Sequence, residues 1–151
     1  MEINQSGIDL VKKFEGSRLN AYLDSVNVPT IGYGATFYEN GNKVKIGDKI
    51  SQQRADELLT YHLNLFAKGI TPLITSKVNS NQFSALVSFA YNVGIGALKS
   101  STLLKKVKAN PNDKTIANEF AKWNKGGGKV LAGLTSRRAK ESDIYFKKID
   151  E

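Results

Sequence analysis

The chain has no cysteine and only one histidine, His62, among its 151 residues. The absence of cysteine excludes a disulfide framework and a thiolate metal site, and a single histidine cannot build a His-rich metal centre. No apolar run approaches the roughly 20 residues that a helix needs to cross a bilayer. We therefore expect a protein with no membrane span, no metal and no other cofactor.

The amino-terminal stretch, MEINQSGIDLVKKFEG, does not read as a secretory signal peptide, because acidic and polar residues interrupt its short apolar part. We expect the protein, as synthesised, to be soluble and cytoplasmic. A length of 151 residues suits one compact domain, and no repeat, low-complexity tract or long linker divides the chain. The sequence predicts a single domain over residues 1–151.

The net charge of +8 belongs entirely to the second half of the chain. Residues 1–76 hold 8 Lys and Arg against 8 Asp and Glu, whereas residues 77–151 hold 14 against 6. Such an asymmetry favours an anionic partner for the second half, which would be nucleic acid, a membrane surface or an acidic polymer. The alternative is a solvated basic surface that serves solubility.

Residue patterns in the first third predict one helix followed by a small sheet. Ser6 and the residues after it fit a capping box, and Gly16 is a plausible end for the helix that follows. Residues 19–46 are rich in Tyr, Val, Thr and Ile, and Asn40-Gly41 is a strong hairpin signal. We expect residues 19–46 to form an antiparallel sheet.

The rest of the chain is helical in pattern. Apolar residues recur at helical spacing in the segment that follows Ser51, which contains His62, and Pro72 limits its extension. A nearly uniform apolar run, FSALVSFAYNVGIGAL, predicts a central buried helix, and shorter amphipathic helices are expected near 102–109, 115–123 and 136–149. We interpret Trp123 as core packing and His62 as a surface or hydrogen-bonded residue. The fold class is α+β.

Glu15, Asp24 and Thr30 form the most informative pattern in the sequence. Glu15 falls on the last turn of the first predicted helix, where the helix dipole and the nearby Phe14 and Leu19 disfavour a charged carboxylate. Asp24 ends a predicted strand at a wetter turn, and the Thr30 hydroxyl could position a water. One protonated and one ionised carboxyl are what glycosidic hydrolysis requires. Singly, each residue also has a plainer interpretation, as a solvated helix-end glutamate, a turn-forming aspartate or a strand-forming threonine.

The segment from Glu15 to Thr36, EGSRLNAYLDSVNVPTIGYGAT, resembles the catalytic segment of phage-type lysozymes, glycoside hydrolase family 24. Further blocks resemble the same family in the same order: QFSALVSFAYNVG, STLLKKV, EFAKWNKGGGKVLAGL and the Arg137-Arg138-Ala139 run. The resemblance implies a lysozyme-like catalytic domain, with a β-rich lobe over about 18–50 and a helical lobe over about 70–151 plus the N-terminal helix. A long helix would join the lobes, and the active-site cleft would lie between them.

The resemblance implies an endolysin that hydrolyses the β-1,4 bond between N-acetylmuramic acid and N-acetylglucosamine in peptidoglycan and thereby lyses the host. Glu15 would be the general acid, and Asp24 would stabilise positive charge on the sugar and hold the attacking water with Thr30, in an inverting reaction. Arg138 matches the arginine expected to pair with the catalytic glutamate. Asn92 falls where the family presents an amide to the sugar.

The resemblance also implies a monomer that leaves the host cytoplasm through a phage-encoded pore and meets peptidoglycan strands in the periplasm or cell wall. One departure from the family pattern is Ala35, because many relatives have a histidine after the GYG turn. Any ion pair or pH dependence contributed by that histidine would be missing here.

Two alternatives stay open at this point. The first is a lytic transglycosylase that cleaves the same bond, although a water-holding pair of Asp24 and Thr30 favours hydrolysis. The second is a non-catalytic basic module that binds cell wall or nucleic acid. The sequence has no recognisable helix-turn-helix, aromatic RNA-binding motif or zinc finger, and its basic residues are spread over several segments, so we expect no nucleic-acid partner.

The basic second half predicts that lytic activity depends on salt. Bacterial envelopes are anionic, and a basic helical lobe would concentrate the enzyme on them through interactions that salt screens. We expect activity on purified cell walls to fall as ionic strength rises. Equal activity in low and high salt would contradict this explanation of the charge.

Overall fold

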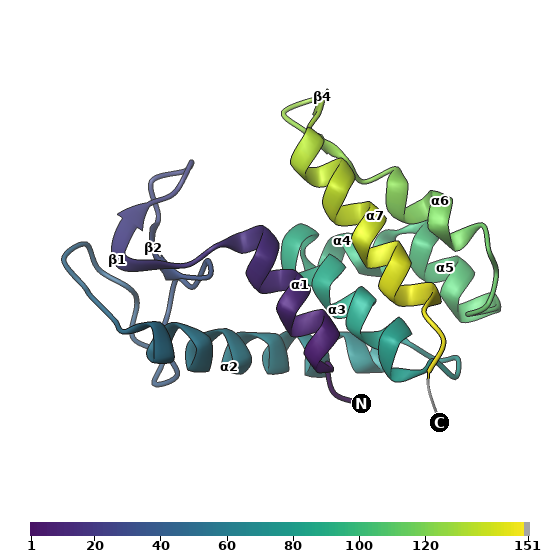
Figure 1. Cartoon of the computed structure of the whole chain (residues 1–151), viewed down its shortest axis with the longest axis horizontal. Coiled ribbons are helices and arrows are strands. Elements are labelled where there is room, and N and C mark those ends of the chain that lie inside the picture. Colours follow the sequence, from purple (N-terminus) through teal and green to yellow (C-terminus); the bar gives the residue numbers. More distant parts are fainter. Residues whose placement is uncertain (150–151) are drawn as a thin grey trace.

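The computed structural model describes residues 1–149 and places them in two lobes joined by one long helix (Figure 1). Helix α1 (Gln5–Glu15) leads into strands β1 (Arg18–Leu23) and β2 (Pro29–Gly32) of the β-rich lobe. Helix α2 (Gln52–Ile70) then runs from that lobe to the helical lobe. This arrangement confirms the α+β class.

The helical lobe is built around α3 (Ser80–Val93), which contacts α1, α2 and α7. The remaining elements follow in chain order: η1 (Thr71–Leu73), α4 (Ile95–Ser100), α5 (Thr102–Ala109), α6 (Ile116–Ala121), the short strands β3 (Lys125–Gly126) and β4 (Lys129–Val130), and α7 (Ala132–Phe146). No helix within residues 1–149 is both long and apolar enough to cross a membrane.

The start of α1 differs from the expected capping box, because Asn4 caps the helix and Ser6 lies inside it. The Asn4 side chain accepts a hydrogen bond from the backbone N–H of Gly7, at 3.1 Å. Asn4 is an equally good cap, and it is also fixed from outside the helix. Its amide nitrogen Nδ2 donates to Oδ1 of Asn81 on α3, at 2.8 Å.

Asn81 ties the two ends of the described chain together. While its Oδ1 accepts from Asn4, its Nδ2 donates to the backbone carbonyl of Lys147, at 3.1 Å. The side chain of Asn81 is itself buried on α3. The first helix and the segment after α7 are therefore held to the same point of the central helix.

The β-rich lobe contains less regular sheet than the sequence predicted. β1 and β2 pair antiparallel, with an irregularity between Arg18 and Tyr22. The predicted turn at Asn40-Gly41 forms, and Gly41 takes the left-handed conformation with φ of 87°. Only the single bridge between Phe37 and Lys43 flanks this turn. The Asn-Gly signal specified a turn, while strands also need a continuous ladder of partners that this lobe does not supply.

The helix boundaries agree best with the sequence predictions where a residue next to the helix caps it. The segment predicted at 102–109 is α5, and α2 begins directly after Ser51, as predicted, with the Ser51 side chain as its cap. The central helix α3 ends at Val93 because Gly94 has a φ of 99°, and the chain resumes as the separate helix α4. The last helix begins at Ala132, earlier than the predicted 136.

Two clusters of buried apolar residues account for the two lobes. The larger cluster centres on α3, where residues such as Phe83, Leu86 and Phe89 are at most 1% exposed. A small one in the β-rich lobe consists of Ile31, Ala35, Val44 and Leu58. α2 contributes to both, with Leu58 in the small cluster and Leu63, Ala67 and Ile70 in the larger one. Its apolar face thus extends the core from one lobe into the other.

The central position of α3 predicts a large loss of stability for Leu86→Ala. The Leu86 side chain is fully buried, so truncation removes apolar contacts and leaves a cavity. We expect the free energy of unfolding to fall by about 2–5 kcal/mol in urea denaturation. Leu65→Ala on α2, where the side chain is 38% exposed, is the control and should change it by less than about 1 kcal/mol. Similar losses for both variants would contradict this description of the core.

Candidate active site

Glu15 is the last residue of α1, and the chain turns away immediately after it. Gly16 caps the helix with a φ of 66°, a conformation that disfavours side chains, and β1 begins at Arg18. The Glu15 carboxyl therefore projects from a helix end at the junction of the two lobes. Its side chain is 22% exposed, so it is accessible yet largely shielded from water.

Glu15 lines two pockets, one on each side of its carboxyl group. The first has a volume of about 230 Å³ and is formed by the turn after β2 together with residues of α2 and α3. The second has a volume of about 350 Å³ and is formed by the end of α1, the start of α7 and Asn92 of α3. Glu15 is thus the residue that the two pockets share.

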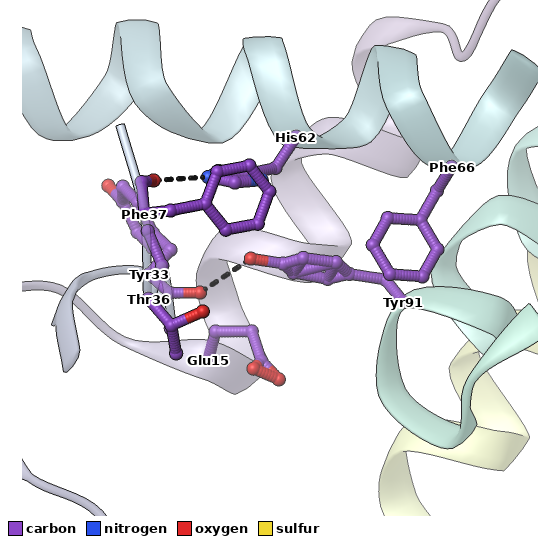
Figure 2. Close-up of a pocket in the computed structure, with 9 residues that line it drawn as sticks. Glu15, Tyr33, Thr36, Phe37, His62, Phe66 and Tyr91 are labelled. Atoms are coloured by element: carbon purple, nitrogen blue, oxygen red, sulfur yellow. Dashed lines mark hydrogen bonds between the residues drawn. The ribbon is translucent and has the colours of Figure 1, made fainter. Parts of the chain in front are cut away.

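Aromatic side chains dominate the first pocket. Figure 2 shows Glu15 below the Tyr91 ring, with Phe66 beside Tyr91 and with Phe37 and His62 together farther from Glu15. Ala35 also lines this pocket and packs into the small apolar cluster of the β-rich lobe. Position 35 therefore brings no charge to the pocket in this chain.

The arginine that contacts Glu15 is Arg137, which corrects the prediction for Arg138. Nη1 of Arg137 donates to Oε1 of Glu15 at 2.9 Å, and the arginine side chain is 3% exposed. The predicted partner of Glu15 was thus one residue too far along α7. Local spacing did not separate the two arginines, because Arg137 and Arg138 lie four and three residues before Glu141 and both contact it.

Arg138 lies behind this pair and does not contact Glu15. Its Nη2 donates to Oδ1 of Asn92 at 2.8 Å, and its Nε lies 2.7 Å from Oε1 of Glu141. The guanidinium also lies over the ring of Phe89, 5.0 Å from its centroid. Asn92 is thereby held with its carbonyl toward Arg138, which leaves its amide N–H₂ for the second pocket that it lines.

Asp24 follows β1 and organises the turn between the two strands. Its Oδ1 accepts hydrogen bonds from the backbone N–H groups of Val26 and Val28, both at 2.9 Å. Asn27 in the same turn has a positive φ of 63°. The turn-forming interpretation of Asp24 therefore holds, and it is compatible with a catalytic role because both bonds use the same carboxylate oxygen.

Thr30 lies on β2 opposite Tyr22 and is 4% exposed. Its hydroxyl donates to the backbone carbonyl of Val28 at 2.8 Å. Because the single hydroxyl proton is used, Thr30 can only accept a hydrogen bond from any further partner, such as a water. Asp24 and Thr30 belong to the same β1–β2 ribbon, whereas Glu15, Asn92 and Arg137 meet in the second pocket.

Tyr91 and Gly34 complete the surroundings of the Glu15 carboxyl, and sequence reasoning missed both. Tyr91 donates its hydroxyl proton to the carbonyl of Tyr33 at 2.8 Å (Figure 2). Burial raises the pKa of Tyr91 well above its usual value, and the negative charge of Glu15 adds to that effect. A Cβ at Gly34, where φ is 97°, would lie 3.9 Å from Oε2 of Glu15. Backbone therefore approaches the carboxyl closely here.

The structure also shows where His62 and Trp123 lie. His62 is buried, its Nε2 is 2.9 Å from the carbonyl oxygen of Phe37, and its ring meets that of Phe37 edge-on. It ties α2 to the β-rich lobe, so it is the hydrogen-bonded residue that the sequence allowed. Trp123 packs edge-on against Phe89 of the main core, as interpreted from the sequence.

Comparison with known proteins identifies the family. The chain matches the family model described as phage lysozyme over residues 12–141, a range that contains every site residue discussed above. It is 47% identical over 148 residues to an endolysin of Bacillus phage B103 and 37% identical over 146 residues to an endolysin of Salmonella phage P22. Each alignment covers 97% of this chain, with 54% of the B103 protein and 99% of the P22 protein.

The chain spans about half the length of the Bacillus phage relatives that it matches. Among solved structures, an endolysin from Escherichia coli O157:H7 phage FAHEc1 has a TM-score of 0.88 at 37% identity. That superposition covers 99% of this chain and 96% of the other. The lysozyme-like fold is therefore confirmed as well as the sequence match. The chain belongs to the phage lysozyme family.

Proposed function

We propose that this protein is an endolysin that hydrolyses the β-1,4 bond between N-acetylmuramic acid and N-acetylglucosamine in peptidoglycan. The observation that carries the proposal is a partly buried carboxyl group, Glu15, which lies between two pockets and is held by Arg137. Membership of the phage lysozyme family supports the same reaction class. The protein would act as an N-acetylmuramidase.

Glu15 is the general acid in this proposal. Arg137 occupies Oε1, while Oε2 lies on the side of Gly34 and Tyr91. A proton on Oε2 would therefore face the cleft, from which it can pass to the glycosidic oxygen as the bond breaks. The buried guanidinium keeps the carboxyl group in one orientation and stabilises the carboxylate that remains after proton transfer.

Asp24 and Thr30 supply the other half of the reaction. Two backbone N–H groups fix the Asp24 carboxylate through Oδ1, and Oδ2 has no hydrogen bond within residues 1–149. Oδ2 can therefore bind a water or face the positive charge that develops on the sugar ring. Thr30 acts as an acceptor for the same water, because its own proton is bound to Val28. Attack by that water on the face opposite the leaving group would invert the configuration.

Asn92 and the basic residues of the helical lobe would contribute to binding. The Asn92 amide N–H₂ would donate a hydrogen bond to a sugar oxygen bound in the second pocket. Exposed lysines such as Lys105, Lys108 and Lys129 would attract the protein to an anionic envelope. We further propose a monomer that reaches the wall from the host cytoplasm through a phage-encoded pore.

Product analysis tests the reaction type. Hydrolysis adds water and leaves a reducing end, whereas a lytic transglycosylase leaves a 1,6-anhydro end. We expect mass spectrometry of muropeptides released from purified peptidoglycan to show the hydrated product. A mass lower by one water would identify a transglycosylase. Release of no fragment would instead favour a binding module.

Substitution of the proposed acid tests its role. Glu15→Gln keeps the shape and one hydrogen-bond acceptor toward Arg137 but cannot donate a proton of suitable acidity. General acid catalysis typically contributes about 10²–10⁴-fold, so we expect a loss of that order in the rate of turbidity decrease of permeabilised cells. Asp9→Asn, on an exposed side of the same helix, is the matched control and should retain the rate. Equal clearing by wild type and Glu15→Gln would reject the assignment.

A further inference from the structure

A group of buried charges lies directly behind Glu15, and the proposed reaction does not use all of them. The side chains of Arg138 and Glu141 are fully buried, and that of Arg137 is 3% exposed. All three belong to α7. Buried charges are costly unless they are paired, so an arrangement of this kind needs an explanation beyond solubility.

Glu141 is the centre of the group. Its Oε2 accepts from the Ser88 hydroxyl at 2.6 Å and from Nε of Arg137 at 3.3 Å. Nη2 of Arg138 also donates to Oε2 at 3.3 Å, and Nε of Arg138 lies 2.7 Å from Oε1. One carboxyl group thus contacts two guanidinium groups, of which one holds Glu15 and the other does not.

The charges balance only when Glu15 is included. Within residues 1–149, the salt bridges of Arg137 go to Glu15 and Glu141, and that of Arg138 goes to Glu141. The two arginines therefore carry two fixed positive charges. The carboxyl groups that pair with them are the buried Glu141 and the partly exposed Glu15. An arginine side chain stays protonated in proteins, so only the two glutamates can alter this balance.

We propose that Arg138 and Glu141 are a buried counter-charge pair that sets the pH range over which Glu15 keeps its proton. If Glu141 carries its charge, it offsets Arg138, and Glu15 faces a net charge of +1 from these three side chains and not +2. A general acid must hold its proton until the substrate takes it, and two unbalanced arginines would drive that proton off. The proposal deepens the function proposed above and depends on it.

Other ionisable groups also face Glu15, and none of them changes in the test. Tyr91 approaches from α3, and Tyr33 and His62 line the first pocket from the β-rich lobe and α2. Lys12 and Lys13 precede Glu15 on the last turn of α1. Because these residues stay in place, a difference between variants and wild type reports on the pair in α7.

The test compares pH–rate profiles on purified peptidoglycan for the wild type, Glu141→Gln, Arg138→Met and the double variant. Glu141→Gln removes a negative charge, so Glu15 should ionise more readily and the alkaline limb should move to lower pH. Arg138→Met removes a positive charge, so the limb should move to higher pH. Each shift should be about one pH unit, as expected for a unit charge several ångströms away at an effective dielectric constant of about 20. The double variant should return close to wild type.

Glu119→Gln is the matched control. Glu119 is also a buried glutamate flanked by two cations, with Lys106 at 3.1 Å and Lys122 at 3.0 Å, but it lies on α6. Its removal is expected to lower thermal stability and leave the position of the alkaline limb unchanged. A shift equal to that of Glu141→Gln would show that loss of a buried charge anywhere moves the profile, which would overturn the proposal.

A measurement on the wild type keeps the proposal testable if a single variant does not fold. Burial raises the pKa of the Glu141 carboxyl, and the two guanidinium groups act against that rise. We expect carbon-13 NMR of labelled carboxyl groups to show Glu141 ionised throughout the active pH range. A protonated Glu141 in that range would overturn the proposal, as would folded single variants with unshifted profiles. An active wild type with either result would leave the proposed hydrolysis standing.

Discussion

The ion pair between Glu15 and Arg137 is the interaction on which the arrangement of this protein depends. It joins the end of the first helix to the first half of the last helix, across 122 positions of sequence. The helix end alone would leave Glu15 in water, and α7 alone would bury two arginines against the single carboxylate of Glu141. The central helix α3 makes the meeting possible because it packs against both α1 and α7 and supplies the carbonyl of Ser88 to Arg137.

The two lobes differ in regularity because their apolar cores differ in size. The helical lobe surrounds a long apolar helix, and its elements are fixed by close packing. The β-rich lobe has a small core of its own, so its shape relies on turns, on backbone bonds and on α2, to which His62 ties it. Asp24 illustrates the result, because the carboxylate to which we assign a role in the reaction is also the group that holds its own turn together.

Sequence reasoning succeeded where local chemistry decides the outcome. The end of α1 at Gly16, the start of α2 after Ser51 and the turn at Asn40-Gly41 all follow from properties of a few neighbouring residues. It failed where distant partners decide. Arg137 and Arg138 are adjacent arginines on one helix, and only the packing of α7 on α3 determines which of them meets Glu15. The close approach of Gly34 and Tyr91 to Glu15 is likewise a property of three-dimensional packing.

The contacts of Asn81 determine where another domain could be fused to this fold and how the chain could be circularly permuted. It holds the residues before α1 and after α7 to one point on α3, so both ends of the described chain emerge together. α1 then carries the chain 11 residues, or about 16 Å, from that point to Glu15. A fused module at either end would start a helix length away from the Glu15 carboxyl. The two described ends could also be linked and the chain reopened at the Gly127-Gly128 turn, a circular permutation that leaves the central helix intact.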